Sequence, residues 1–215
     1  SLSAEIDSLQ RLRVGNGAAM VTKPNTGEIL AMIGSKNYFN AEDDGQVNVA
    51  LAYRQPGSSI KPLVYATAFQ EKSLNPGTLL LDIPTCFKMP NQADYCPKNY
   101  TGDFKGPISV RQSLGNSLNI PAVKTISTID VPTFMSRAKK MGITGWDDAS
   151  NYGPSIALGG GEVRMFDMAQ SFGSLANLGI NVPLNPILKI ENYKSEVLKE
   201  FDVNETTEDL KSMQE

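Results

Sequence analysis

The sequence predicts an α+β fold. Two pairs of short apolar strand patterns, at residues 18–33 and 186–201, each enclose a polar turn. From about residue 109 the pattern between these pairs is mainly helical. Separate runs of strands and helices are typical of α+β domains. We therefore expect a partial antiparallel sheet packed on helices, together with a mostly helical lobe, and 215 residues are enough to bury a substantial core.

The chain begins with a helical pattern and then a hairpin pattern. Residues 1–13 place Ile6, Leu9 and Leu12 at helical spacing, which predicts an amphipathic helix. Apolar runs at 18–21 and 28–33 follow, and the segment between them has a proline first and a glycine last, as in a hairpin turn with a bulge.

The second half contains the longer helical patterns. Ser109 followed by Gln112 is a capping-box signature for a short helix that ends near Gly115. Pro121 suits the first position of the next helix. Three further helices are predicted at 121–128, 132–141 and 163–178. The last of them is expected to pack one apolar face into the core, formed by Phe166, Ala169, Phe172 and Ala176.

Composition excludes several classes of function. The net charge is −3, and no basic cluster interleaved with aromatic residues occurs, which argues against nucleic-acid binding. The chain has no histidine, which excludes a Ser-His-Asp triad and histidine metal sites. Cys86 and Cys96 are too few for a structural zinc site. A disulfide in an oxidising, extracytoplasmic compartment is the favoured interpretation, and two unrelated free thiols are the alternative.

No run is apolar and long enough to span a bilayer, and no signal peptide opens the chain. An extracytoplasmic protein needs an export or anchor segment, so we expect that this sequence is a fragment and that such a segment lies upstream of it.

The segment from Arg54 to Pro62 suggests a nucleophile and its base. The turn-forming pair Pro56-Gly57 precedes a helical run, and Ser58 and Lys61, three residues apart, face the same side of a helix. A partly desolvated lysine with a lowered pKa can accept the proton of a serine hydroxyl. Proline at position 62 is tolerated within a first turn, so the helix should start at or just before Ser58.

The same spacing occurs by chance at Ser136 and Lys139, on the expected exposed face of the 132–141 helix. The motif therefore depends on partners elsewhere in the chain. Ser117-Leu118-Asn119, in a turn between two predicted helices, could supply a hydroxyl that relays a proton and an amide that holds the lysine or a peptide carbonyl. The alternative is structural, with Ser117 capping the next helix and Asn119 stabilising the turn. The same three residue types also occur at Ser73-Leu74-Asn75, in an expected loop, so the tripeptide alone is weak evidence.

Together these segments resemble the transpeptidase domain of penicillin-binding proteins, specifically the bifunctional class A group. The resemblance covers residues 1–203. The matching segments are 24–34, the nucleophile segment 54–62, Pro97-Lys98-Asn99-Tyr100, 106–111, 117–123, 157–163 and 167–170.

The resemblance implies a role for each site residue. Ser58 would attack the bond between the last two D-alanines of a peptidoglycan stem peptide, and Lys61 would act as general base. Ser117 would pass the proton to the departing D-alanine, and Asn119 would orient Lys61 and the substrate. β-Lactams would acylate Ser58 as substrate mimics. No cofactor and no metal are expected. The domain would lie on the extracytoplasmic face of the bacterial membrane, attached only through an upstream anchor.

One motif of the family is missing. No Lys-Thr-Gly or Lys-Ser-Gly occurs, so the chain looks cut before the strand that binds the substrate carboxylate. We expect a linker helix at 1–17, a partial transpeptidase domain at 18–203 and a polar tail at 204–215. The missing C-terminal part of the domain is a further expected partner. A DD-carboxypeptidase or β-lactamase of the same fold, and a non-catalytic penicillin-sensing or scaffold domain, remain as alternatives.

Overall fold

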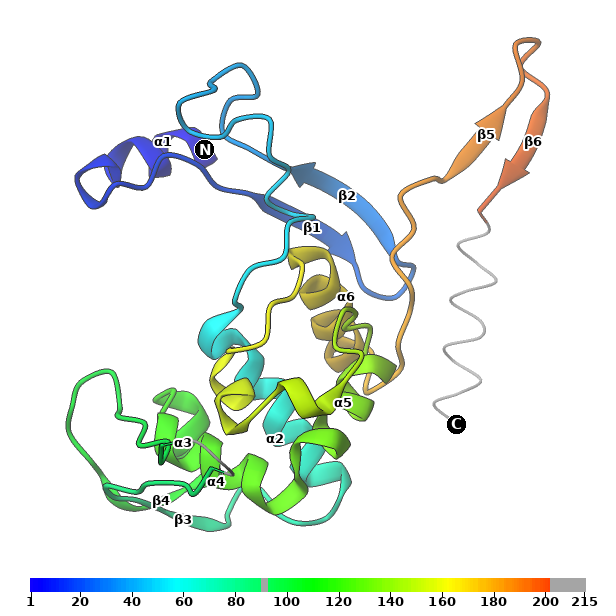
Figure 1. Ribbon diagram of the computed structural model, residues 1–215. Helices are drawn as coiled ribbons and strands as arrows, with labels where there is room; N and C mark the ends of the chain where they lie inside the picture. Colours follow the sequence, from blue (N-terminus) through cyan, green and yellow to red (C-terminus); the bar gives the residue numbers. More distant parts are fainter. Residues whose placement is uncertain (90–92, 202–215) are drawn as a thin grey trace. The chain divides into compact units, whose positions relative to one another are not determined.

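The computed structural model describes residues 1–89 and 93–201 (Figure 1). The polar tail predicted at 204–215 lies outside the described residues. The chain divides into two compact units. The first, here called the hairpin unit, comprises residues 1–54, 140–145 and the described part of 163–215. The second, the helical unit, comprises residues 55–139 and 146–162.

The predicted N-terminal helix is shorter than its pattern. Helix α1 spans Leu2–Ser8, and a separate 3-10 turn spans Gln10–Leu12. Ile6 is buried, whereas Leu12 is 64% exposed, so the expected apolar face does not continue. The 3-10 turn ends at Arg13, whose backbone lies in the left-handed region at φ 59°.

The first hairpin is confirmed. Strands β1 (Ala19–Lys23) and β2 (Glu28–Ile33) pair antiparallel, with a bulge between Val21 and Thr22. Gly27 closes the turn at φ 75°, a conformation that glycine adopts without steric cost. Strand β1 packs against helix α6 (Met165–Ala176), so a hairpin packed on a helix forms the centre of this unit.

The buried face of α6 differs from the prediction. Phe172 is 42% exposed and Ala176 is also exposed, while the buried positions include Asp167 and Ser171. The remaining predicted core positions, Phe166 and Ala169, are only half-buried. Polar side chains can be buried here because they are paired: Arg164 donates to Asp167 at 2.7 Å, and the Ser171 hydroxyl donates to the Asp167 carbonyl.

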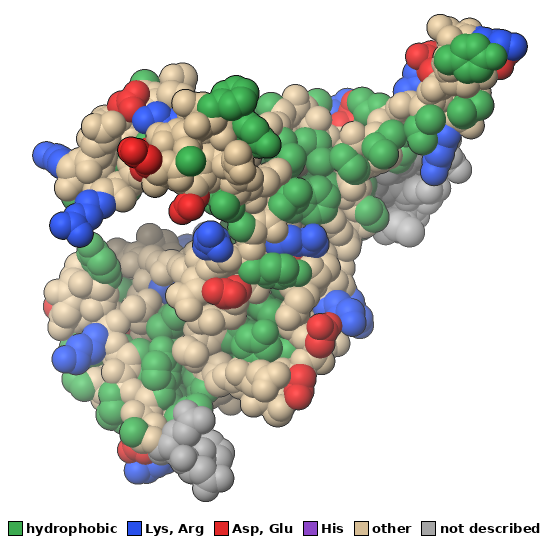
Figure 2. Space-filling model, turned by 45° about the horizontal axis from the view of Figure 1, so that its top comes forward, with side chains coloured by type: hydrophobic (Ala, Val, Ile, Leu, Met, Phe, Trp, Pro, Cys, Tyr) green, Lys and Arg blue, Asp and Glu red, His purple; other side chains and the backbone are tan. Residues whose placement is uncertain are grey.

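The second hairpin is also confirmed, with β5 (Lys189–Glu191) pairing antiparallel with β6 (Val197–Glu200). Apolar side chains remain exposed along it (Figure 2). They are Ile187, Leu188, Ile190, Val197 and Leu198.

Among the described residues, the helical unit contains four α-helices and several short 3-10 turns. The helices are α2 (Lys61–Gln70), α3 (Val110–Gly115), α4 (Asn119–Ile129) and α5 (Val131–Lys140, whose last residue belongs to the hairpin unit). The 3-10 turns include Gly57–Ile60 and Pro154–Leu158. Helices α2 and α4 pack together, with Tyr65, Val110 and Ala122 in the core between the elements.

Helices α3 and α5 lie close to their predicted bounds, whereas α4 starts earlier than predicted. The capping box at Ser109 is present, with both reciprocal contacts to Gln112. Helix α4 begins at Asn119 rather than at Pro121. Pro121 therefore occupies the third position, where the backbone N–H is still within the unpaired first turn and its absence costs little.

One sheet of the helical unit was not predicted. Strands β3 (Leu79–Asp82) and β4 (Gly106–Ser109) pair antiparallel across a long connection. Within this connection Cys86 and Cys96 form the predicted disulfide. The flanking residues Phe87 and Tyr95 exchange backbone hydrogen bonds. Among the described residues, no helix has the length and apolar character needed to cross a membrane.

Candidate functional site

The predicted nucleophile segment folds as a two-stage helix start. A 3-10 turn spans Gly57–Ile60, and the α-helix begins only at Lys61, slightly later than predicted. The Lys61 backbone N–H donates to the Ser58 carbonyl, which fixes both residues within one turn. Pro62 is the second residue of α2, where its missing N–H has little effect, as the sequence indicated.

The hydroxyls of the two neighbouring serines differ in their bonding. The Ser59 hydroxyl donates to the Pro56 carbonyl at 2.6 Å and is occupied locally. The Ser58 side chain is exposed and has no hydrogen-bond partner within residues 1–89 and 93–201. Of these two serines, only Ser58 therefore presents a hydroxyl that is available to a substrate.

Lys61 is buried and surrounded by neutral acceptors. Its residue exposure is 0%, and its ammonium donates to the Ser117 carbonyl at 2.5 Å, the Ser117 hydroxyl at 3.1 Å and the Asn119 Oδ1 at 2.7 Å. Desolvation lowers the pKa of Lys61 from 10.5 to about 8. Because this pKa lies much closer to neutral pH than that of a free lysine, the neutral amine that a general base requires becomes accessible.

Ser117 lies in the turn between α3 and α4, in a strained backbone conformation. Its φ is 52°, which is uncommon for a residue other than glycine and often occurs at functional sites. The alternative that Ser117 caps α4 is wrong, because the N-cap is Leu118 and no side chain caps this helix. Ser117 instead turns both its carbonyl and its hydroxyl towards Lys61.

Asn119, the first residue of α4, is held from three directions. Its Oδ1 accepts from Lys61, and its Nδ2 donates to the Lys98 carbonyl at 2.7 Å. Its backbone N–H donates to the Asn99 Oδ1 at 2.8 Å. Asn119 thus contacts the lysine and also stabilises the turn, so both interpretations of this residue describe real contacts.

The glycine-rich segment at 159–161 supports the nucleophile turn. Gly159 adopts φ 81°, and a Cβ atom at this position would collide with the backbone of Gly57. Two glycines thus allow the two backbones to approach closely, which no larger residue at position 159 would permit. The sequence of this segment resembles the family but does not by itself indicate this structural role.

Asp82 and Asn99 are two further residues near the site, to which the sequence assigned no role. Both are buried, and the Asn99 side-chain nitrogen donates to each oxygen of the Asp82 carboxylate at 2.9 Å. Asn99 follows shortly after Cys96 and Pro97, but its partner is 17 residues earlier, at the end of an unpredicted strand.

The two chance repeats of the motifs differ from the site in burial. Lys139 is exposed on α5, whereas Lys61 is buried. Ser73 and Asn75 lie after α2, and the Asn75 Oδ1 accepts from the Gly77 N–H. Neither repeat assembles a lysine with a serine and an asparagine.

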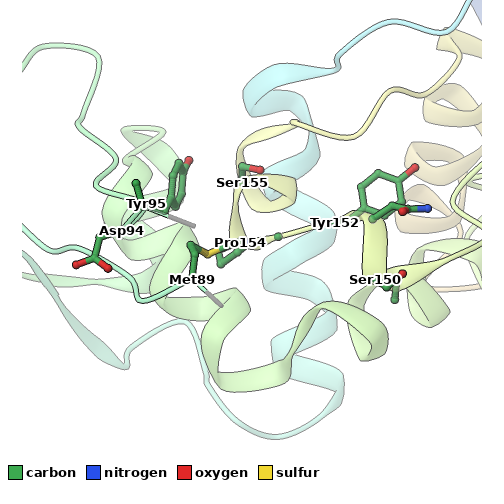
Figure 3. Close-up of a pocket in the computed structure, with 11 residues that line it drawn as sticks. Met89, Asp94, Tyr95, Ser150, Tyr152, Pro154 and Ser155 are labelled. Carbon is green, nitrogen blue, oxygen red and sulfur yellow. The ribbon is translucent and has the colours of Figure 1, made fainter. Parts of the chain in front are cut away.

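The helical unit also has a cavity of about 590 Å³ (Figure 3). It is lined by residues 93–95 and 149–155 together with Met89, and Tyr95, Met89 and Pro154 face into it. None of Ser58, Lys61, Ser117 and Asn119 lines this cavity. It is therefore separate from the site around Lys61.

The arrangement around Lys61 is suited to nucleophilic acyl transfer. An unpartnered hydroxyl, a buried amine and a second hydroxyl within 3.1 Å of that amine can move a proton from the nucleophile to a leaving group. Among the described residues, no group of three or more metal-binding side chains is present.

Comparison with known proteins supports this interpretation. The family model described as the penicillin binding protein transpeptidase domain matches residues 17–214. Penicillin-binding protein 2D of Bacillus subtilis is 35% identical over 179 residues, which is 82% of this chain. Penicillin-binding protein 1A of Rickettsia bellii is 30% identical over 201 residues, or 93% of this chain. The chain spans only about a quarter of these relatives, 25% and 24% of their lengths.

A solved structure agrees with these relatives. The crystal structure of penicillin-binding protein 1A from Haemophilus influenzae matches with a TM-score of 0.73 and 28% identity. The match covers 87% of this chain and 27% of that chain. The expected α+β fold is therefore confirmed.

Proposed function

Because the chain belongs to the penicillin-binding protein transpeptidase family, we propose that it carries the acylating residues of a peptidoglycan DD-transpeptidase. The observation that carries this proposal is the environment of Lys61. A fully buried lysine, held by Ser117 and Asn119, lies one turn after an unpartnered serine hydroxyl. Ser58 is the nucleophile in this proposal, and Lys61 is its base.

The proposed reaction begins when Ser58 Oγ attacks the carbonyl carbon between the last two D-alanines of a stem peptide. The hydroxyl proton passes to the neutral Lys61 amine, and the peptide C–N bond then breaks. Ser117, 3.1 Å from the Lys61 nitrogen, relays the proton to the departing D-alanine amine. The product is an ester on Ser58, which an amine of a neighbouring stem attacks to form the cross-link.

The same residues account for β-lactam binding. Ser58 opens the lactam ring by the same attack, and the ring nitrogen receives the proton. The backbone N–H of Ser58 supplies one donor for the oxyanion that develops, and such donors contribute about 3–4 kcal/mol in related reactions.

The first hairpin has exposed apolar faces that bear on how the complete domain is built. In strand β2, apolar residues point to both faces and remain exposed, with Leu30 at 59% and Ile33 at 43%. A two-stranded hairpin is marginally stable by itself. We propose that further strands, with the family's Lys-Thr-Gly motif, cover this hairpin in the complete domain. The disulfide supports a location on the extracytoplasmic side of the membrane.

Labelling with a fluorescent penicillin tests the proposal, in a polypeptide that contains this chain and the completed sheet. Ser58→Ala should abolish stable stoichiometric labelling. Ser59→Ala should retain it, because the Ser59 hydroxyl bonds only to Pro56. Equal labelling of the parent protein and Ser58→Ala would refute the assignment of the nucleophile.

The alternatives give other outcomes in the same assay. Rapid release of the label would indicate a β-lactamase. Release of D-alanine from a stem peptide without cross-linking would indicate a DD-carboxypeptidase. Stable labelling with no reaction on stem peptides would indicate a penicillin-sensing domain, and no labelling at all would exclude the enzyme.

A further inference from the structure

A buried polar pair lies behind Asn119, on the side away from Lys61. Asp82, the last residue of β3, is 0% exposed, and Asn99 is 5% exposed. The Asn99 Nδ2 donates to both Asp82 carboxylate oxygens and to the Asp103 carbonyl, each at 2.9 Å. The Lys105 backbone N–H also donates to Asp82 at 2.9 Å. The buried carboxylate is therefore fully engaged.

These contacts determine which way the Asn99 amide points. Because its NH₂ group faces Asp82, its oxygen faces the start of α4, where it accepts from the Asn119 N–H at 2.8 Å. The residue before it, Lys98, accepts from the Asn119 side-chain Nδ2 through its carbonyl at 2.7 Å. One short segment thus holds both the backbone and the side chain of Asn119.

The orientation of Asn119 follows from these two contacts. With its Nδ2 bound to Lys98, only its Oδ1 can face Lys61, and the observed distance is 2.7 Å. A rotated amide would place N–H donors against the Lys61 ammonium, which has no acceptor. The side of Asn119 that Lys61 contacts is thus set by residues about 20 positions earlier in the chain.

We propose that Asp82 and Asn99 are positioning residues for acylation, which hold Asn119 and, through it, the amine of Lys61. Among the described residues, neither residue forms a hydrogen bond with Ser58 or Lys61. The kinetic part of this inference rests on the proposed function, whereas its geometric part does not.

Amide hydrogen exchange tests the geometric part without any catalytic activity. In Asn99→Ala the Asn119 N–H loses its acceptor, so its exchange should become much faster, while amides in the middle of α2 keep their protection. Asn75→Ala is the matched control, because the Asn75 Oδ1 also accepts one backbone N–H, from Gly77 at 2.9 Å. This control should leave exchange at Asn119 unchanged. Unchanged exchange in Asn99→Ala would overturn the proposal.

Acylation kinetics in the protein with its complete transpeptidase domain test the kinetic part. A misplacement of about 1 Å typically costs about 10²-fold in rate, so Asn99→Ala should slow the acylation step by about 10- to 100-fold. The dissociation constant of the preceding non-covalent penicillin complex should change little, because the side chain of Asn99 is buried and bonds to Asp82, Asp103 and Asn119. Asn75→Ala should acylate at the parent rate.

A swap variant separates positioning from folding. Asp82→Asn with Asn99→Asp keeps one amide and one carboxylate, and position 99 still offers an oxygen to the Asn119 N–H. We expect this double variant to recover most of the acylation rate, whereas Asn99→Asp alone places two carboxylates together and should not. Full folding of Asn99→Ala with an unchanged acylation rate would refute positioning. A parent protein that is never labelled would instead refute the proposed function, and the exchange result would stand.

Discussion

Burial of Lys61 should make the stability of the protein depend on pH in a specific range. The pKa of Lys61 is about 8 in the folded state, against an ordinary value of 10.5. Below pH 8 the lysine is protonated in both states, and the folded state bears the cost of burying the charge. Above pH 10.5 it is neutral in both states, and this cost is absent. The free energy of unfolding should therefore rise with pH between 8 and 10.5.

The size of this effect follows from the two pKa values. At about 1.36 kcal/mol per pKa unit, the difference between them corresponds to about 3 kcal/mol. Lys61→Met replaces the amine with an apolar side chain of similar length and removes this contribution. It also leaves the acceptors on Ser117 and Asn119 unpaired, but that cost does not vary with pH.

Urea unfolding of the parent protein and Lys61→Met from pH 7 to 11 measures the effect. Other ionisable groups cancel in the difference between the two proteins, so this difference should change by about 3 kcal/mol across the range. Lys139→Met is the matched control, because Lys139 is exposed and its removal relieves no desolvation. A difference for Lys61→Met that stays constant with pH would refute the reasoning. Since the neutral amine is the proposed base, the acylation rate should also rise with pH and level off above about 8.

Three further substitutions have defined outcomes. Replacing Cys86 and Cys96 by serine opens a loop with a sequence separation of 10, which should lower the free energy of unfolding by about 2.7 kcal/mol in denaturant titrations. Ser109→Ala removes the capping box and should cost about 1 kcal/mol by the same measurement, and no loss would contradict the role of the cap. Gly159→Ala forces a Cβ atom against Gly57 at a positive φ, so it should cost about 1–3 kcal/mol and also slow penicillin labelling. Parent-like labelling would show that this contact does not hold the nucleophile turn.

The sequence predicted the elements whose causes are local. The Ser109 capping box, the glycine of the first hairpin and the proline at the start of α2 act within a few residues, and each appears where expected. Local patterns were less informative about which face of a helix is buried. On α6 the apolar stripe is partly exposed, and Asp167 is buried because Arg164 and Thr144 pair with it.

Strands β3 and β4 show a second limit of the sequence. Leu79 pairs with Ser109 across the disulfide-bonded connection, and neither strand has an alternating pattern that marks it. The pairing of Asp82 with Asn99 depends on this sheet, so the residues behind Asn119 could not be predicted either.

By itself, the sequence determined that Ser58 and Lys61 share one helical turn, and it identified the family through the combination of its motifs. The tertiary structure decided what makes that lysine usable as a base. Its three acceptors belong to Ser117 and Asn119, which are 56 and 58 positions later in the chain. These residues lie just before and at the start of α4, the helix that packs against α2. The pKa of a lysine depends on solvent exclusion and on nearby acceptors in space, and sequence spacing specifies neither of these.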